Sequence, residues 1–112
     1  MDCLFCKIIN GEIPSKKVYE DEQVYAFYDI NPQAPVHFLV VPKIHIESAA
    51  AITPENSAVV AHIFEVIAKL AGELSLDEGF RVVSNVGKHG AQTVKHLHFH
   101  VLGGRQMSEQ VC

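Results

Sequence analysis

The chain has 112 residues, of which 48% are hydrophobic and 20% charged, and its formal net charge is −4 at pH 7. This composition is typical of a globular protein, and we expect one domain over residues 1–112 because so short a chain cannot bury two hydrophobic cores. The negative charge argues against a broad basic surface for nucleic acid, and no apolar run approaches the roughly 20 residues of a membrane span.

The cysteines and the first residues favour a reducing compartment. Three cysteines is an odd number, and two of them, Cys3 and Cys6, form a Cys-x-x-Cys pair, so we do not expect a disulfide framework. The opening residues, MDCLFCKIING, lack the basic region and the long apolar run of a secretory signal. We therefore expect a cytoplasmic protein that does not associate with membranes.

The first half of the chain predicts a short helix and three strands. Residues 3–9 form the helix, which ends at the turn pair Asn10-Gly11. Residues 18–19 and 24–28 are β-rich runs around an acidic turn, which predicts a hairpin. After the loop NPQAP comes the apolar run HFLVVP, which has the length of a buried strand and stops at Pro42.

The second half predicts one long helix and two more strands. The helix begins at Thr53-Pro54, because threonine suits an N-cap and proline the first helical position. The helix is expected to stop near residues 77–79, and its apolar stripe consists of Val60, Ile63, Ile67, Leu70 and Leu74. FRVVSN and the histidine-rich segment are strands, separated by the loop VGKHGAQT. Short connections favour antiparallel neighbours, so we expect an α+β domain with the helix on one sheet face.

Three histidines alternate with apolar residues in the last predicted strand, namely His96, His98 and His100. Alternate side chains of a strand share one face, so the three imidazoles would line up while Leu97, Phe99 and Val101 enter the core. A helix does not fit this spacing, because a step of two residues turns the side chain by about 200°.

Three roles are open for this row of imidazoles. The simplest is decoration of a solvated sheet face, which gives no reason for strict alternation. A metal centre using all three fits poorly, because residues i and i+4 of a strand lie about 13 Å apart and a zinc–nitrogen bond is about 2 Å long. Phosphoryl chemistry fits better, because imidazole can be nucleophile, base or proton donor near neutral pH. The middle residue, His98, is then the natural nucleophile.

The segment HLHFHVL fits the signature of the histidine triad (HIT) family, in which three histidines alternate with apolar residues. The segments FCKIINGEIPSKKVYED, AFYDINPQAPVHFLVVPKIHI and NVGKHGAQTVKHLHFHVLGGRQM also resemble that family in order and spacing, particularly its nucleotide-binding phosphoramidase (Hint-like) branch. The resemblance covers the chain from residue 4 to residue 107. It implies a five-stranded antiparallel sheet with one main helix and a short N-terminal helix, and a homodimer whose sheets join edge to edge.

The resemblance also implies an activity. A purine nucleoside phosphoramidate or related ester would be hydrolysed to AMP or GMP, with no metal ion needed for the chemistry. His98 would attack the α-phosphorus and form a nucleotidyl-histidine intermediate, with its Nδ1–H held by the carbonyl of His96. His100 would donate to a phosphate oxygen, with His37 in support. Two alternatives stay open, namely a dinucleoside polyphosphate hydrolase and a nucleotide-binding regulatory protein with negligible catalysis.

The resemblance further implies where the nucleoside binds. Asp29 would bind the ribose hydroxyls and Ile30 would lie beside the base, although an aspartate before INP could also simply form a turn. The purine pocket would be lined by Leu4, Phe5, Ile8 and Phe27. Apolar residues at such positions could equally be plain core.

The loop before the triad would bind the phosphate and the leaving group. Asn85 would contact the sugar–phosphate side, and Ala91, Gln92 and Thr93 would contact the phosphate. Ala91 stands where the family has glycine, and its methyl group would restrict the backbone. Thr93 stands where serine is frequent, which keeps the hydroxyl and adds bulk. Neither change removes a catalytic atom.

Cys3 and Cys6 supply half of a four-ligand zinc site. Some bacterial members of the HIT family complete such a site with histidines that match His45 and His96, so the resemblance implies a structural Cys₂His₂ zinc ion. It would pin the N-terminal segment to the triad strand and leave His98 free. A redox dithiol is the alternative, although no βαβ pattern surrounds the pair as in thioredoxin-like proteins.

Overall fold

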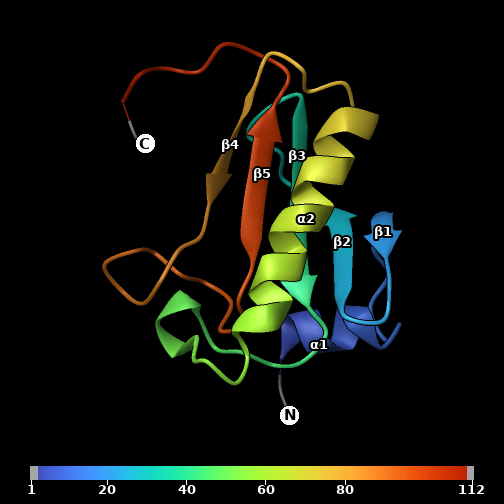
Figure 1. Cartoon of the computed structure of the whole chain (residues 1–112), viewed down its shortest axis with the longest axis vertical. Coiled ribbons are helices and arrows are strands. Elements are labelled where there is room, and N and C mark those ends of the chain that lie inside the picture. The colour runs from blue at the N-terminus through green and yellow to red at the C-terminus, as the bar shows by residue number, and fades with distance from the viewer. Residues whose placement is uncertain (1–2, 111–112) are drawn as a thin grey trace.

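A five-stranded antiparallel sheet forms the centre of the molecule (Figure 1). The computed structural model describes residues 3–110. Across the sheet the strand order is β1-β2-β3-β5-β4. The strands are β1 (Lys17–Glu20), β2 (Val24–Tyr28), β3 (Val36–Pro42), β4 (Phe80–Val83) and β5 (Phe99–Gly103). Every neighbouring pair is antiparallel, which confirms the sequence prediction.

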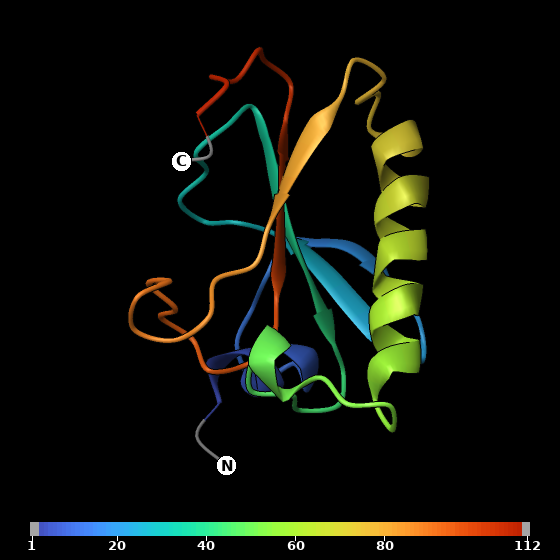
Figure 2. The same ribbon diagram turned by 60° about the vertical axis from the view of Figure 1, so that its left-hand side comes forward.

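Two hydrophobic layers cover the two faces of this sheet. Along β3, Phe38 belongs to the layer beneath α2 (Ser57–Glu73), while the next residue, Leu39, belongs to the layer beneath α1 (Leu4–Ile9). Figure 2 shows α2 lying along one side of the sheet. The predicted main helix and short N-terminal helix are both confirmed, and they pack on opposite faces because strand side chains alternate.

The predicted start of the main helix is wrong, because α2 begins at Ser57 and not at Pro54. Asn56 accounts for the difference: its Oδ1 accepts the backbone N–H of Thr53 at 2.8 Å, and its Nδ2 donates to the carbonyl of Ala51 at 3.2 Å. These bonds close a separate turn after the short 3-10 helix η1 (Ala49–Ala51). The buried stripe of α2 is Val59, Ile63, Val66, Ile67, Leu70 and Ala71. The predicted members Val60 and Leu74 are only partly buried.

The predicted start of the last strand is also wrong, because β5 begins at Phe99 and not at His96. The preceding segment is held by other bonds, in which the N–H of Leu97 donates to the carbonyl of Ile46 at 2.6 Å. The division of side chains between the two faces is nevertheless as predicted, since the apolar members of the alternation lie in the layer beneath α2, namely Leu97, Phe99 and Val101. The alternation of side chains therefore begins at Leu97, ahead of the hydrogen-bonded ladder, whereas residues 94–96 form a bend.

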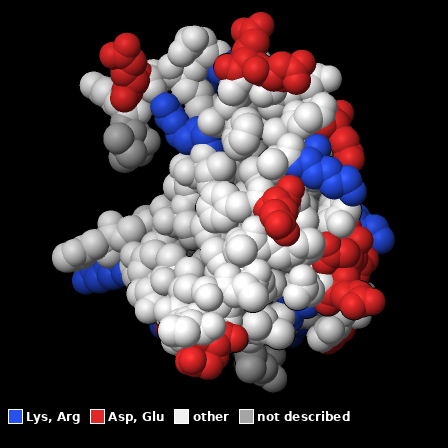
Figure 3. Space-filling model, viewed as in Figure 1, with Lys and Arg blue, Asp and Glu red and all other residues white. Residues whose placement is uncertain are grey.

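The surface shows mixed charge and no candidate membrane span. On the face seen in Figure 3, Lys and Arg side chains are interspersed with Asp and Glu side chains. Among the helices within residues 3–110, none is both long and apolar enough to cross a membrane. The mixed charge on the visible face agrees with the expectation drawn from the net charge.

Candidate functional site

The carbonyl of His96 fixes the orientation of the His98 ring. Its oxygen lies 2.6 Å from Nδ1 of His98, and because a carbonyl can only accept, Nδ1 carries the proton. In a neutral imidazole the other nitrogen, Nε2, then has a free lone pair. Burial lowers the pKa of His98, an effect that this hydrogen bond partly opposes. The ring is therefore neutral near pH 7 and offers Nε2 as a nucleophile.

The layer beneath α1 covers the His98 ring, which is only 5% exposed. Phe5 meets it edge to face, with the ring centroids 5.0 Å apart, and also contacts Phe27 at 5.5 Å. Phe5, Ile8 and Phe27 are all buried here, whereas Leu4 is 46% exposed. Three of the four predicted pocket residues thus form core packing above the His98 ring, and of these four only Phe5 touches it in a ring contact.

A second group of side chains gathers around His100. Nδ1 of His100 lies 2.9 Å from Nε2 of His37, and Oδ2 of Asp29 lies 3.4 Å from the same Nε2. The antiparallel register brings them together, because His100 pairs with Leu39, two residues from His37. Burial lowers the pKa of His37, against the effect of Asp29, and it lowers the pKa of His100 to about 4. Both imidazoles are therefore neutral near pH 7.

Two groups that the sequence analysis does not identify also hold these histidines. The backbone N–H of Gln33 donates to Nδ1 of His37 at 3.0 Å. The hydroxyl of Ser84 donates to the carbonyl of His98 at 2.8 Å. A backbone amide in a loop leaves no signal in residue type, and Ser84 is visible in the sequence only as part of a strand end.

The structure places Asp29 and Ile30 at the end of β2, next to this histidine group. Oδ1 of Asp29 accepts the backbone N–H of Asn31 at 2.8 Å, so the aspartate does form a turn. Its other oxygen faces His37. Ile30 is 99% exposed, which leaves its apolar side chain open to a ligand.

The loop from residue 86 to residue 93 has a constrained backbone. Ala91 has φ 58, in the left-handed region that glycine prefers, and Thr93 is exposed. A Cβ on Gly90 would lie 2.4 Å from the carbonyl oxygen of Val86, so only glycine fits there. The predicted restriction at Ala91 is thus a left-handed conformation within a tightly folded loop.

Asn85 and Gln92 hold this loop in place. Nδ2 of Asn85 donates to the carbonyl of Gly90 at 2.7 Å. Oε1 of Gln92 accepts the N–H of Gly87 at 3.0 Å, and its Nε2 donates to the carbonyl of Glu47 at 2.8 Å. Both side chains therefore stabilise the loop from within. Asn85 belongs to this loop and not to the predicted strand FRVVSN, because β4 ends at Val83.

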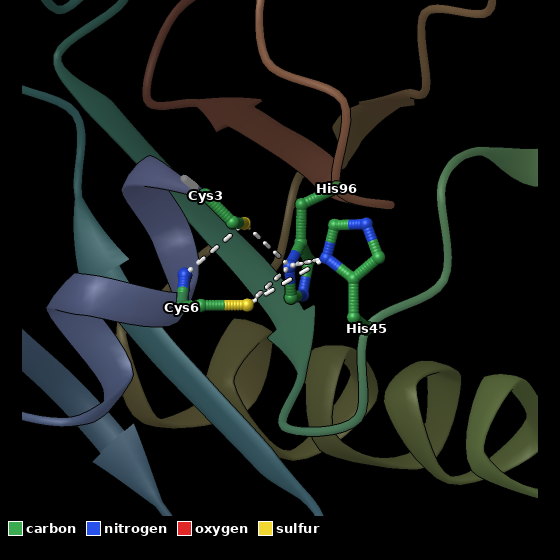
Figure 4. Close-up of side chains that lie close together, drawn as sticks. All are labelled: Cys3, Cys6, His45 and His96. Carbon is green, nitrogen blue, oxygen red and sulfur yellow. Dashed lines mark hydrogen bonds between the residues drawn. The ribbon is translucent and has the colours of Figure 1, made fainter. Parts of the chain in front are cut away.

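The predicted metal ligands converge at the other end of the histidine segment (Figure 4). Nδ1 of His96 lies 3.2 Å from Sγ of Cys3, 3.5 Å from Sγ of Cys6 and 3.1 Å from Nδ1 of His45. All four ligand atoms lie within 4.8 Å of one another. Tetrahedral zinc with bonds of 2.0 to 2.3 Å places its ligands about 3.3 to 3.8 Å apart, so these four side chains can hold such an ion with small shifts.

The carbonyl of Pro42 prepares His96 for this role. Its oxygen lies 2.8 Å from Nε2 of His96, so Nε2 carries the proton and Nδ1 turns a lone pair towards the sulfur atoms. Burial and the neighbouring Cys3 thiol raise the pKa of Cys6 to about 11, and a bound cation acts in the opposite direction. The donor set and the fixed tautomer both suit a metal ion.

A surface cleft of about 560 Å³ lies beside these four side chains, the candidate metal cluster. Cys3 and His45 line it together with Leu4, Thr93 and Lys95. The cleft gives the candidate metal cluster a path to solvent, which a metal site needs for loading. It also places the predicted leaving-group residue Thr93 on the same side of the molecule as this cluster.

The fold and the site are those of a histidine triad domain, with a five-stranded antiparallel sheet, one long helix and a central histidine oriented by the carbonyl of the first. The HIT domain profile matches residues 10–107, and the chain belongs to the HIT family. It is similar to a HIT family hydrolase from Clostridium thermocellum, with 44% identity and a TM-score of 0.96 over 99% of this chain and 97% of that one.

Two further solved structures are similar over almost the whole chain. A histidine triad protein from Clostridium difficile is 54% identical, with a TM-score of 0.94 over 98% of this chain and 96% of that one. A histidine triad nucleotide-binding protein from Candida albicans is 36% identical, with a TM-score of 0.81 over 99% of this chain and 87% of that one. The family assignment therefore covers both the sheet and the candidate site.

Proposed function

We propose that the protein hydrolyses purine nucleoside phosphoramidates or acyl-nucleotides and releases the nucleoside 5'-monophosphate, AMP or GMP. The single observation that carries this proposal is the 2.6 Å bond from Nδ1–H of His98 to the carbonyl of His96, which leaves Nε2 of a neutral ring free to attack phosphorus. Membership of the HIT family supports a hydrolase of this kind. The similarity to the Candida albicans nucleotide-binding protein supports a nucleotide as substrate.

The reaction has two displacements at phosphorus. Nε2 of His98 forms a bond to the α-phosphorus while the bond from phosphorus to the leaving nitrogen breaks, and the leaving amine takes up a proton from solvent. Water then attacks the phosphorus, gives a proton to solvent and breaks the Nε2–phosphorus bond, which restores the neutral ring. His100 donates to a non-bridging oxygen and so stabilises the charge that develops there, while Asp29 binds the ribose.

The proposal gives the metal cluster a structural role. Cys3, Cys6, His45 and His96 would hold Zn²⁺, which would cross-link α1 to the segment before β5 and supply nothing to the displacement steps. The protein would act in the cytoplasm, where thiol ligands stay reduced. As in the family, we expect a homodimer joined through sheet edges.

Trapping the covalent intermediate tests this function. The protein is mixed for milliseconds with an adenosine phosphoramidate labelled at the α-phosphorus, quenched in base and digested. The expected result is an acid-labile label on the peptide that carries His98. Bound nucleotide without any labelled protein would show a binding module instead, and faster turnover of a diadenosine polyphosphate than of the phosphoramidate would show the other hydrolase of this fold.

A further inference from the structure

The loop between β2 and β3 contacts the pair of His37 and His100 through the backbone amide of Gln33. We propose that the backbone amide of Gln33 fixes the tautomers of His37 and His100, so that His100 presents an N–H and not a lone pair to the substrate. Gln33 is then a positioning residue that acts through its main chain. This inference rests on the proposed function, because the substrate group that receives the N–H is a phosphate oxygen.

The direction of the hydrogen-bond chain follows from its first member. A backbone N–H can only donate, and that of Gln33 lies 3.0 Å from Nδ1 of His37. Nδ1 therefore accepts, and the proton of the neutral ring is on Nε2. Nε2 lies 2.9 Å from Nδ1 of His100 and 3.4 Å from Oδ2 of Asp29. Two N–H groups would repel each other at 2.9 Å, so Nδ1 of His100 must be an acceptor. The proton of the neutral His100 ring is then on its own Nε2.

The tautomer of His100 matters because the ring is not protonated on both nitrogens near pH 7, so only one of them can donate a hydrogen bond. Burial lowers the pKa of both rings, and that of His100 to about 4, so near pH 7 each ring has one N–H and one lone pair. In the opposite tautomer, the proton of His100 would be on Nδ1 and would be donated to Nε2 of His37. Its Nε2 lone pair would then face the phosphate and repel it. One loop amide thus selects a donor.

Contacts from two elements hold the Gln33 amide in place. On its own loop, Nε2 of Gln33 donates to the carbonyl of Asn31 at 3.0 Å, and the N–H of Asn31 donates to Asp29. From the segment that follows β5, the guanidinium of Arg105 donates to the carbonyl of Gln33 at 3.3 Å. Arg105 follows β5 by two residues and β5 carries His100, so neighbouring parts of the chain hold both ends of the chain of bonds.

The same bonds argue against a metal ion in this group. Asp29, His37 and His100 place their ligand atoms within 4.8 Å of one another, as a metal site would. In the observed arrangement neither nitrogen of His37 has a free lone pair, because Nδ1 accepts from Gln33 and Nε2 carries the proton. His96 differs, because its Nδ1 lone pair faces the cysteines.

Replacing one atom tests the proposal. Substituting Gln33 with its α-hydroxy acid turns the amide N–H into an ester oxygen and keeps the side chain, and Gln33→Pro removes the same N–H genetically. Gln33→Ala, which keeps the N–H, is the matched control. The tautomers of His37 and His100 are read from ¹⁵N shifts and long-range ¹H–¹⁵N couplings at pH 7.5, and turnover is measured on an adenosine phosphoramidate.

The unaltered protein and Gln33→Ala should show single Nε2–H tautomers of His37 and His100. The ester should show mixed tautomers and a kcat about ten-fold lower, with KM changed less than about two-fold, since a ten-fold loss corresponds to about 1.4 kcal/mol, within the range of one hydrogen bond. Unchanged tautomers in the ester protein would overturn the proposal, and so would changed tautomers with full turnover. If the unaltered protein forms no nucleotidyl-histidine, the proposed function fails, whereas the NMR result still decides the proton arrangement.

Discussion

The two ends of the segment from His96 to His100 use the same kind of side chain for opposite purposes. At one end, the carbonyl of Pro42 holds the proton on Nε2 of His96, and a lone pair faces two sulfur atoms. At the other end, the amide of Gln33 holds the proton on Nε2 of His37, and through it on His100. In both places a main-chain group fixes which nitrogen carries the proton. At His96 this leaves a lone pair for the candidate metal ion, and at His100 it leaves an N–H for the proposed substrate.

Replacing His98 by alanine should have the largest effect of the changes proposed here, because it removes the proposed nucleophile. We expect turnover of a phosphoramidate to fall by at least about a thousand-fold, because the nucleophile is lost. AMP should still bind with a Kd within a few-fold of normal, measured by calorimetry. His62→Asn, on α2 and outside both clusters, is the matched control and should retain turnover. Normal activity of His98→Ala would remove the catalytic end from the comparison.

The packing above the nucleophile gives the next largest effect. Phe5 is buried against His98 and Phe27, so Phe5→Ala should cost about 3 kcal/mol of unfolding free energy. Leu4→Ala, its exposed neighbour, should cost less than about 0.5 kcal/mol. Urea unfolding of the two variants measures both values. Equal costs would contradict the assignment of Phe5 to the core layer beneath α1.

Metal removal should sharpen the contrast between the two ends. With Zn²⁺ at 100-fold above its Kd, binding stabilises the fold by about 2.7 kcal/mol, which corresponds to a Tm shift of about 10 °C for a domain of this size. We expect chelation, or Cys6→Ser, to lower the Tm by that amount and to leave kcat of the folded protein within about two-fold, since His98 does not ligate the ion. Lost turnover well below the Tm would show that the metal takes part in the chemistry.

His62, which lies on α2 away from both groups of histidines, gives the smallest expected effect, and this effect depends on pH. The hydrogen bond to Asp21 raises the pKa of His62, which also contacts Glu65. The pKa of Asp21 is lowered, because its bonds to His62 and to backbone amides outweigh the opposing effect of burial. The stabilisation from His62 is therefore present below pH 6.5 or so and is lost as the pH rises through its higher folded value.

The corresponding contribution of Asp21 persists down to about pH 4 and is lost below it. We expect His62→Asn to lower stability at pH 5.5 by up to about 1 kcal/mol, because the pair is partly exposed and screened. At pH 9 the variant should match the unaltered protein. Urea midpoints at both pH values measure the difference, and an equal loss at both would show that packing, not charge, explains it.

Side-chain periodicity is the part of the fold that the sequence predicts well. Alternation in the triad segment correctly divides Leu97 and Phe99 from the histidines, because it is a property of any extended chain. The start of β5 depends instead on where the partner strand ends its ladder, at Val40 opposite Phe99. The start of α2 depends on the side-chain bonds of Asn56, which a proline after threonine does not reveal.

The site shows the same division between side chains and main chain. Residue types point to His98, His96 and the two cysteines, because imidazole and thiol carry the chemistry themselves. The groups that fix their protonation are the carbonyl of Pro42 and the amide of Gln33. Every residue except proline offers both groups, so no sequence pattern distinguishes these two. Only the fold brings them to the rings.

The position of β5 has a consequence for how the protein folds. β5 follows β4 in the chain yet lies between β3 and β4, so the sheet keeps a gap during folding until residues 99–103 pair with both neighbours. Until then the edge of β3 is an unpaired, apolar template for wrong pairing. Because His98 precedes this strand by one residue, the proposed nucleophile takes its place only when the sheet closes, so we expect no turnover from a half-folded chain.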